Sequence, residues 1–173
     1  MIDSNKLNLG SGCMLKADYV NFDAQEIKEG GLTTDVVGQI KDIIGVFGKE
    51  RFEEIFCVHV LEHLVPEDGE KMIEDCYAML KPGGRLILEA PDIIGCLELY
   101  QEKHPAVPLE VVLTSLYGHN KDQWKELGYH RWGYTRDSGA ELVEKYGFRV
   151  THKGIGMTHG MGKRDFRVEG IKK

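Results

Sequence analysis

The spacing of apolar and polar positions divides the chain into short strands and amphipathic helices. Apolar runs predict strands in the first half at residues 7–9, 19–22, 33–37, 52–60 and 85–91. The run FEEIFCVHV, which ends at Val60, is rich in β-branched and other apolar residues. Such a run is typical of a strand in a parallel sheet whose two faces are both covered.

Helical spacing of apolar residues appears between and after these strands. The predicted helices are residues 39–47, 66–81, 93–103, 109–116 and, behind Thr135 as N-cap, 136–146. Two closing runs, 148–154 and 165–173, are joined by a short loop and are expected to form an antiparallel pair. Strands that alternate with helices indicate an α/β fold, here a single domain of residues 1–173 with helices on both faces of the sheet.

Composition narrows the class of protein. The chain has 173 residues, 42% hydrophobic and 29% charged, which is ordinary for a globular domain. A net charge of −6 argues against general nucleic-acid binding. No apolar run is long enough for a membrane span, and no signal peptide precedes the first strand. The four cysteines form no Cys-x-x-Cys pair, so we expect reduced core thiols, no metal site and a cytoplasmic protein.

The first strand runs into the glycine loop Gly10-Ser11-Gly12, as in nucleotide-binding units. The third glycine of the dinucleotide fingerprint is missing, and only Cys13–Asp18 separate the loop from the next strand. Six residues are too few for the full helix that seats a pyrophosphate. A nucleoside without phosphates, such as S-adenosylmethionine, needs the glycines only for close approach of the backbone. A simple turn is the alternative interpretation.

Two carboxylates follow the predicted strands at the edge where open α/β sheets bind ligands. Asp23 ends the second strand and would accept hydrogen bonds from two ribose hydroxyls. Asp35, at the end of the third strand, would suit the adenine amino group. For each residue alone, a role in a loop or a cap is the alternative.

Three later segments carry a resemblance to a known family. They are FEEIFCVHVLEHL, MIEDCYAMLKPGG and RLILEAPD. With Leu7-Asn8-Leu9-Gly10-Ser11-Gly12, they resemble the class I S-adenosylmethionine-dependent methyltransferases of the type 11 group. The resemblance implies a Rossmann-like sheet of order 3-2-1-4-5-7-6 with an antiparallel last strand. It also implies S-adenosylmethionine as cofactor and a small-molecule or glycan-precursor acceptor.

The same resemblance implies a set of cofactor-binding residues. These are Leu9, Gly10, Ser11, Gly12, Asp23, Asp35, Val36 and His59. Because the cofactor carries the reactive methyl group, the protein mainly supplies position and, for a hydroxyl acceptor, a base. His59, at the end of the fourth strand, and His63 are candidates, although Glu62 and His63 could instead brace the next helix. Asp92 ends the fifth strand and either faces the cleft or stabilises a turn.

The segment 117–134 concentrates aromatic residues and two histidines, within a helical and aromatic cap at about 92–134. One interpretation is burial against the sheet. The other is a lid over the acceptor, with His130 or His119 as general base and with Tyr117, His119 and Trp132 in contact with substrate. Both interpretations can hold for different residues.

Two rival functions follow from the same sequence. One is a module that binds S-adenosylmethionine without turnover, and the other is a nicotinamide-dependent oxidoreductase, which the missing glycine disfavours. Turnover on any acceptor, and calorimetry with S-adenosylhomocysteine and NAD, distinguish them. We expect no nucleic-acid or membrane partner. The protein is expected to be a monomer or a homodimer, since no helix precedes the first strand and a second copy could cover that side of the site.

Overall fold

The computed structural model describes residues 4–105, 107–119 and 125–173. The strands are β1 (Lys6–Leu9), β2 (Val20–Asp23), β3 (Lys28–Glu29), β4 (Leu32–Thr33), β5 (Val36–Val37), β6 (Phe52–Val58), β7 (Leu80–Pro91), β8 (Phe148–Ile155) and β9 (Asp165–Lys172). The helices are α1 (Ile43–Phe47), α2 (Pro66–Met79), α3 (Ile93–Gln101), α4 (Leu109–Tyr117) and α5 (Arg136–Lys145). Short 3₁₀ turns occur at Ile40–Asp42, Leu61–His63, Lys125–Gly128 and Gly162–Arg164.

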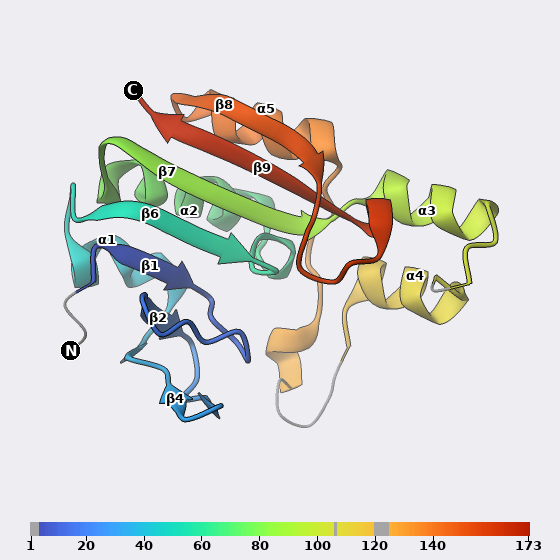
Figure 1. Cartoon of the computed structure of the whole chain (residues 1–173), viewed down its shortest axis with the longest axis horizontal. Coiled ribbons are helices and arrows are strands. Elements are labelled where there is room, and N and C mark those ends of the chain that lie inside the picture. Colours follow the sequence, from blue (N-terminus) through green and yellow to red (C-terminus); the bar gives the residue numbers. More distant parts are fainter. Residues whose placement is uncertain (1–3, 106, 120–124) are drawn as a thin grey trace.

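One seven-stranded sheet organises the chain, with the order β5-β2-β1-β6-β7-β9-β8 (Figure 1). When its strands are renumbered along the chain, this is the predicted order 3-2-1-4-5-7-6. Strand β9 is antiparallel to both β7 and β8, and β1, β2, β5, β6 and β7 pair in parallel. The predicted Rossmann-like α/β sheet is therefore confirmed, with the hairpin β3–β4 as an addition outside it.

The two faces of the sheet differ. Helices α1, α2 and α5 lie on one face, where alternate strand residues form the hydrophobic core (Figure 1). Leu7, Ile55, Leu86 and Phe166 belong to this core and are fully buried. The expectation of helices on both faces was wrong for the described residues, because the alternate positions on the opposite face are mainly polar and need no apolar cover.

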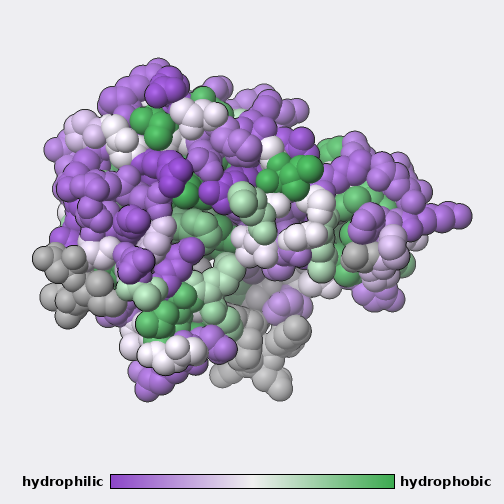
Figure 2. Space-filling model, in the orientation of Figure 1, coloured by the Kyte–Doolittle hydropathy of each residue, from purple (hydrophilic) through white to green (hydrophobic). Residues whose placement is uncertain are grey.

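A network of ion pairs, with one hydrogen bond from a tyrosine hydroxyl, lies on that opposite face. The participating side chains are Tyr19, Glu54, Arg85, Glu169, Arg167 and Glu89. Figure 2 shows the surface over β6, β7 and β9 as predominantly hydrophilic. Burial and the neighbouring Glu54 carboxylate raise the pKa of Tyr19 to about 12, so its hydroxyl stays protonated and donates to Glu54.

The third strand is shorter than the sequence predicts. Residues 33–37 do not form one strand, because two side chains in the middle bind backbone groups elsewhere. Thr34 Oγ1 accepts a hydrogen bond from the Ile27 backbone nitrogen, and the Asp35 carboxylate accepts one from the Asn21 nitrogen. Only Val36–Val37 then pair with β2.

The remaining elements follow the predictions closely. No helix forms between β1 and β2, as expected for so short a connection. Thr135 caps α5 through a capping box with Ser138. Helices α3 and α4 extend beyond the carboxyl end of β7 (Figure 1) and share a small apolar cluster of Leu99, Val107 and Val112. Among the described residues, every helix is too short or too polar to cross a membrane.

Candidate functional site

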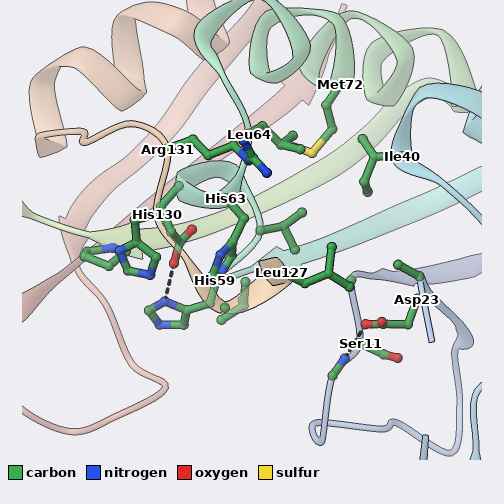
Figure 3. Close-up of a pocket in the computed structure, with 18 of the residues that line it drawn as sticks. Ser11, Asp23, Ile40, His59, His63, Leu64, Met72, Leu127, His130 and Arg131 are labelled. Atoms are coloured by element: carbon green, nitrogen blue, oxygen red, sulfur yellow. Dashed lines mark hydrogen bonds and ion pairs between the residues drawn. The ribbon is translucent and has the colours of Figure 1, made fainter. Parts of the chain in front are cut away.

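A pocket of about 540 Å³ opens at the carboxyl ends of β1, β2 and β6. That volume suits a drug-sized ligand. Figure 3 shows its two ends, with Ser11 and Asp23 at one and His59, His63 and His130 at the other. Apolar side chains, among them Ile40, Leu64, Met72 and Leu127, line the space between and around these ends.

The glycine loop forms the first end. Gly10 and Gly12 both have positive φ, +67° and +48°, which explains why glycine stands at both positions. A Cβ on Gly10 would lie 2.2 Å from Val60 Cγ2, so the backbone is packed directly against the turn that follows β6. The Ser11 side chain is fully buried, and its Oγ has no partner among the described residues.

Asp23, at the end of β2, lies in the pocket wall with 8% of its surface exposed. Its Oδ2 accepts a hydrogen bond from the Gly12 nitrogen at 2.8 Å, and its Oδ1 accepts one from the Gln25 nitrogen at 3.1 Å (Figure 3). A carboxylate has about four lone-pair positions, so two remain for a pair of hydroxyl groups. The side chain therefore both supports the loop and faces the ligand space.

The other predicted cofactor residues on β1 and β5 lie outside the pocket wall. Leu9 is fully buried in the core, and Val36 packs against that core. Asp35 precedes β5 instead of following the third strand, so the predicted position was wrong. Its Oδ2 accepts hydrogen bonds from the Asn21 backbone and side chain, at 2.7 and 3.2 Å. These contacts account for its carboxylate without a ligand.

His59 begins the second end of the pocket, directly after β6. Its φ of +55° is unusual for a residue other than glycine and turns the ring toward Glu62. His59 Nδ1 lies 2.7 Å from Glu62 Oε1 (Figure 3). Burial alone would lower the pKa of His59, but the hydrogen bond and charge of Glu62 outweigh it and raise that pKa. The pKa of buried Glu62 is lowered because His59 likewise outweighs burial, so the two groups form an ion pair.

His63 and His130 meet edge to face, with ring centroids 4.8 Å apart. His63 Nδ1 lies 3.1 Å from the Tyr129 carbonyl oxygen, and His130 Nδ1 lies 3.0 Å from that of Ser115. Burial is the main cause that lowers the pKa of His130, which keeps its ring neutral near pH 7. His119 also lines the pocket, and its buried Nδ1 has no partner among the described residues.

Three predicted substrate residues lie elsewhere. Asp92 is 3% exposed and caps α3, accepting a hydrogen bond from the Gly95 nitrogen at 3.2 Å, so the turn interpretation holds for it. Tyr117 and Trp132 are 67% and 53% exposed and lie outside the pocket wall. Their rings face solvent, because the chain passes the pocket with its histidines turned inward. Their predicted contact with the substrate stays a prediction.

Sequence reasoning missed the central position of Glu62. It was assigned a possible bracing role for the next helix, but the N-cap of α2 is Val65. The three-residue spacing from His59 was the available signal, because a tight turn brings such side chains together. A second group, His159 and Asp165, lies beside His59 through a ring contact of 4.6 Å and a 3.9 Å approach of His59 Nε2 to Asp165. Its residues come from the loop between β8 and β9 and from the first residue of β9.

Comparisons with known proteins agree with this geometry. A family described as "Methyltransferase domain" matches residues 10–153. A SAM-dependent methyltransferase from Archaeoglobus fulgidus is similar in structure, with a TM-score of 0.62, 15% identity and coverage of 96% of this chain and 85% of that one. A SAM-dependent methyltransferase from Mesorhizobium loti has a TM-score of 0.61 at 14% identity, over 96% of this chain and 90% of that one.

A third similar structure is the 1,6-didemethyltoxoflavin-N1-methyltransferase from Burkholderia thailandensis, solved with 1,6-didemethyltoxoflavin and S-adenosylhomocysteine bound. It has a TM-score of 0.61 at 13% identity, over 97% of this chain and 70% of that one. At these identities the likeness concerns the fold. No curated protein matches the sequence significantly.

Proposed function

Because this chain belongs to the methyltransferase domain family and uses S-adenosylmethionine as its cofactor, we propose that it methylates a hydroxyl group of a small molecule or of a sugar in a glycan precursor. The observation that carries the proposal is the division of the pocket into two chemically different ends. One end suits a nucleoside, and the other suits an acceptor whose proton must leave.

The glycine-loop end fits the cofactor on three observations. The Gly10 and Gly12 positions in the pocket wall, the free lone pairs of Asp23 and the apolar side chains near Ile40 match the polar and apolar groups of a nucleoside. When bound, S-adenosylmethionine supplies a methyl group on a positively charged sulfur, which a nucleophile can attack. Asp23 would hold the ribose hydroxyls, and the Gly10–Gly12 backbone would allow close contact.

The histidine end fits an acceptor that has to be activated. His63 and His130 each use Nδ1 toward a backbone carbonyl. Their second ring nitrogens therefore carry lone pairs that can accept a proton or hold a Lewis acid. Such groups serve no purpose for an acceptor that is already a good nucleophile, and this favours an alcohol.

The rival functions account for less of the geometry. A nicotinamide enzyme needs a helix behind the glycine loop to bind the pyrophosphate, and none follows β1. A module that only binds S-adenosylmethionine has no use for a buried carboxylate and two oriented histidines beyond the cofactor end. Leaving such groups partly unsatisfied costs stability, about 1–3 kcal/mol for each buried group.

Calorimetry and a labelling assay test the proposal together. We expect S-adenosylhomocysteine to bind with micromolar affinity and NAD to show no heat of binding. S-adenosylmethionine with a labelled methyl group is then incubated with pools of polyols, sugar nucleotides and amines. Label is expected in the hydroxylated pools. Tight NAD binding without S-adenosylhomocysteine binding, or label confined to the amines, contradicts the proposal.

A further inference from the structure

Three side chains at the histidine end form a compact group of possible metal ligands. Glu62, His63 and His130 each offer a ligand atom, and these atoms all lie within 4.8 Å of one another. All three residues line the pocket, and Figure 3 shows His63 and His130 together at one end of it. Glu62 and His63 come from the turn after β6, whereas His130 comes from the segment before α5.

The hydrogen bonds of the two histidines fix which nitrogen is free. A carbonyl oxygen only accepts, so Nδ1 of His63 and of His130 must carry the hydrogen toward Tyr129 and Ser115. In the neutral ring, Nε2 is then left with its lone pair. This is the arrangement found around metal-binding histidines, in which the other ring nitrogen donates to a carbonyl or carboxylate and orients the ligand.

Glu62 supplies an independent observation. Its side chain is 2% exposed, and Oε1 is occupied by His59 at 2.7 Å. The other oxygen, Oε2, is buried and has no hydrogen-bond partner among the described residues. A buried carboxylate oxygen without a partner is costly, and a cation is the ligand that would satisfy it.

We propose that Glu62, His63 and His130 bind a divalent transition-metal ion whose open positions face the pocket and take an oxygen of the methyl acceptor. Two imidazoles and one carboxylate are a known catalytic ligand set for zinc and for non-haem iron. Imidazole nitrogen disfavours magnesium and calcium, which prefer oxygen. Ligands about 2.1 Å from one ion stand about 3.5 Å apart, so small side-chain rotations complete the site.

A second group of possible ligands, His59, His159 and Asp165, is a weaker candidate. The Arg164 guanidinium donates to Asp165 from Nη2 at 2.8 Å and from Nε at 3.0 Å, and it also contacts His159 Nδ1. The guanidinium therefore occupies both oxygens of the Asp165 carboxylate, whereas Oε2 of Glu62 has no partner among the described residues. The structure therefore assigns the ion to Glu62, His63 and His130.

The proposal rests on the proposed function and narrows its substrate class. A hydroxyl group bound to a divalent ion loses its proton to solvent far more readily than a free alcohol does. Two open positions would also hold a vicinal diol, as found in sugars and polyols. An amine acceptor gains nothing from this site, because the ion would occupy its lone pair.

The test is metal binding by the chain itself. Metal-free protein is titrated with Co²⁺, followed by visible absorption, and with Zn²⁺ by calorimetry. We expect saturable binding that Glu62→Gln, His63→Ala and His130→Ala each weaken at least about tenfold. Two histidine variants serve as matched controls and should bind the ions normally. His152→Ala removes an exposed ring on β8, and His159→Ala disrupts the other group.

Circular dichroism melts and S-adenosylhomocysteine titrations accompany every variant. His63 is only partly buried, so its variant decides the outcome if Glu62→Gln does not fold. Wild-type protein that binds neither ion overturns the proposal, as does binding that depends on His159 and not on His63. Normal S-adenosylhomocysteine binding with no metal binding refutes the metal site alone. Metal binding without any S-adenosylhomocysteine binding refutes the proposed function but still supports the metal site.

Discussion

The two ends of the pocket are built in different ways. The cofactor end comes from one continuous stretch, residues 10–23, which contains two glycines with positive φ and in which the Gly12 nitrogen donates a hydrogen bond to the Asp23 carboxylate. The histidine end is assembled from the turn after β6 and from the segment that precedes α5, with the carbonyls of Ser115 and Tyr129 as supports. The first end depends on local geometry, and the second depends on how distant segments pack.

That difference has a physical consequence. Substitutions at the cofactor end act through a single loop and should change cofactor affinity directly. Substitutions at the histidine end should leave the cofactor in place and change the chemistry. Variants at each end therefore test whether cofactor affinity and turnover can be changed independently.

His130→Ala should give the largest effect, on turnover. A positioned group that handles the acceptor proton contributes roughly 10²–10⁴ in rate, and we expect a loss of that order. Affinity for S-adenosylhomocysteine should stay within about twofold, since Asp23 and the glycine loop are untouched. Stability should fall by about 0.5–1.5 kcal/mol, because the hydrogen bond to Ser115 is lost. Full turnover in a destabilised variant would make His130 a structural clasp only.

Gly10→Ala should disturb the cofactor end by a steric route. The positive φ costs roughly 1–2 kcal/mol for an L-residue, and the contact with Val60 adds about 1–3 kcal/mol of overpacking. Urea unfolding measures the loss, and cofactor affinity should fall with it. In the double variant Gly10→Ala with Val60→Ala, the stability lost through the contact with Val60 should be regained. The loss caused by the positive φ should remain. Additive losses would show that the two residues are not coupled.

Asp23→Ala should weaken binding of S-adenosylhomocysteine at least about tenfold, because hydrogen bonds to a charged group contribute about 1.5–3 kcal/mol. A smaller loss of stability is expected as well, since the Gly12 and Gln25 nitrogens lose their acceptor. Metal binding at the other end should not change. Normal cofactor affinity in this variant would reduce Asp23 to a support for the loop.

The smallest effect concerns pH and a residue outside the pocket. Burial alone would raise the pKa of Glu89, but hydrogen bonds from Thr158 and Arg167 outweigh it and lower that pKa. The contribution of Glu89 to the free energy of unfolding is therefore fully present above about pH 4.5, the ordinary pKa of a glutamate. This contribution is lost as the pH falls through the lowered pKa of the folded state. The free energy of unfolding, measured with urea between pH 3 and 6, should decrease more steeply with falling pH for wild type than for Glu89→Gln. Parallel curves would contradict this assignment.

The fold was readable from the sequence because strand and helix periodicity is a local property. The glycine loop and Asp23 were readable for the same reason. Asp35 was misplaced because its surroundings depend on tertiary contacts, namely the Asn21 hydrogen bonds that its carboxylate accepts. The exposure of Tyr117 and Trp132 depends on tertiary packing in the same way. Glu62 was undervalued because its partner His59 has a positive φ, which no periodicity predicts.

The position of β9 has a consequence for synthesis of the chain. This strand lies between β7 and β8 and pairs with both, although it is made after them. While the ribosome works, β7 and β8 therefore emerge with unpaired edges that no earlier segment can fill. Exposed strand edges invite pairing with other chains. The nascent protein stays at risk of aggregation until Asp165–Lys172 has left the exit tunnel and joins the two halves of the sheet.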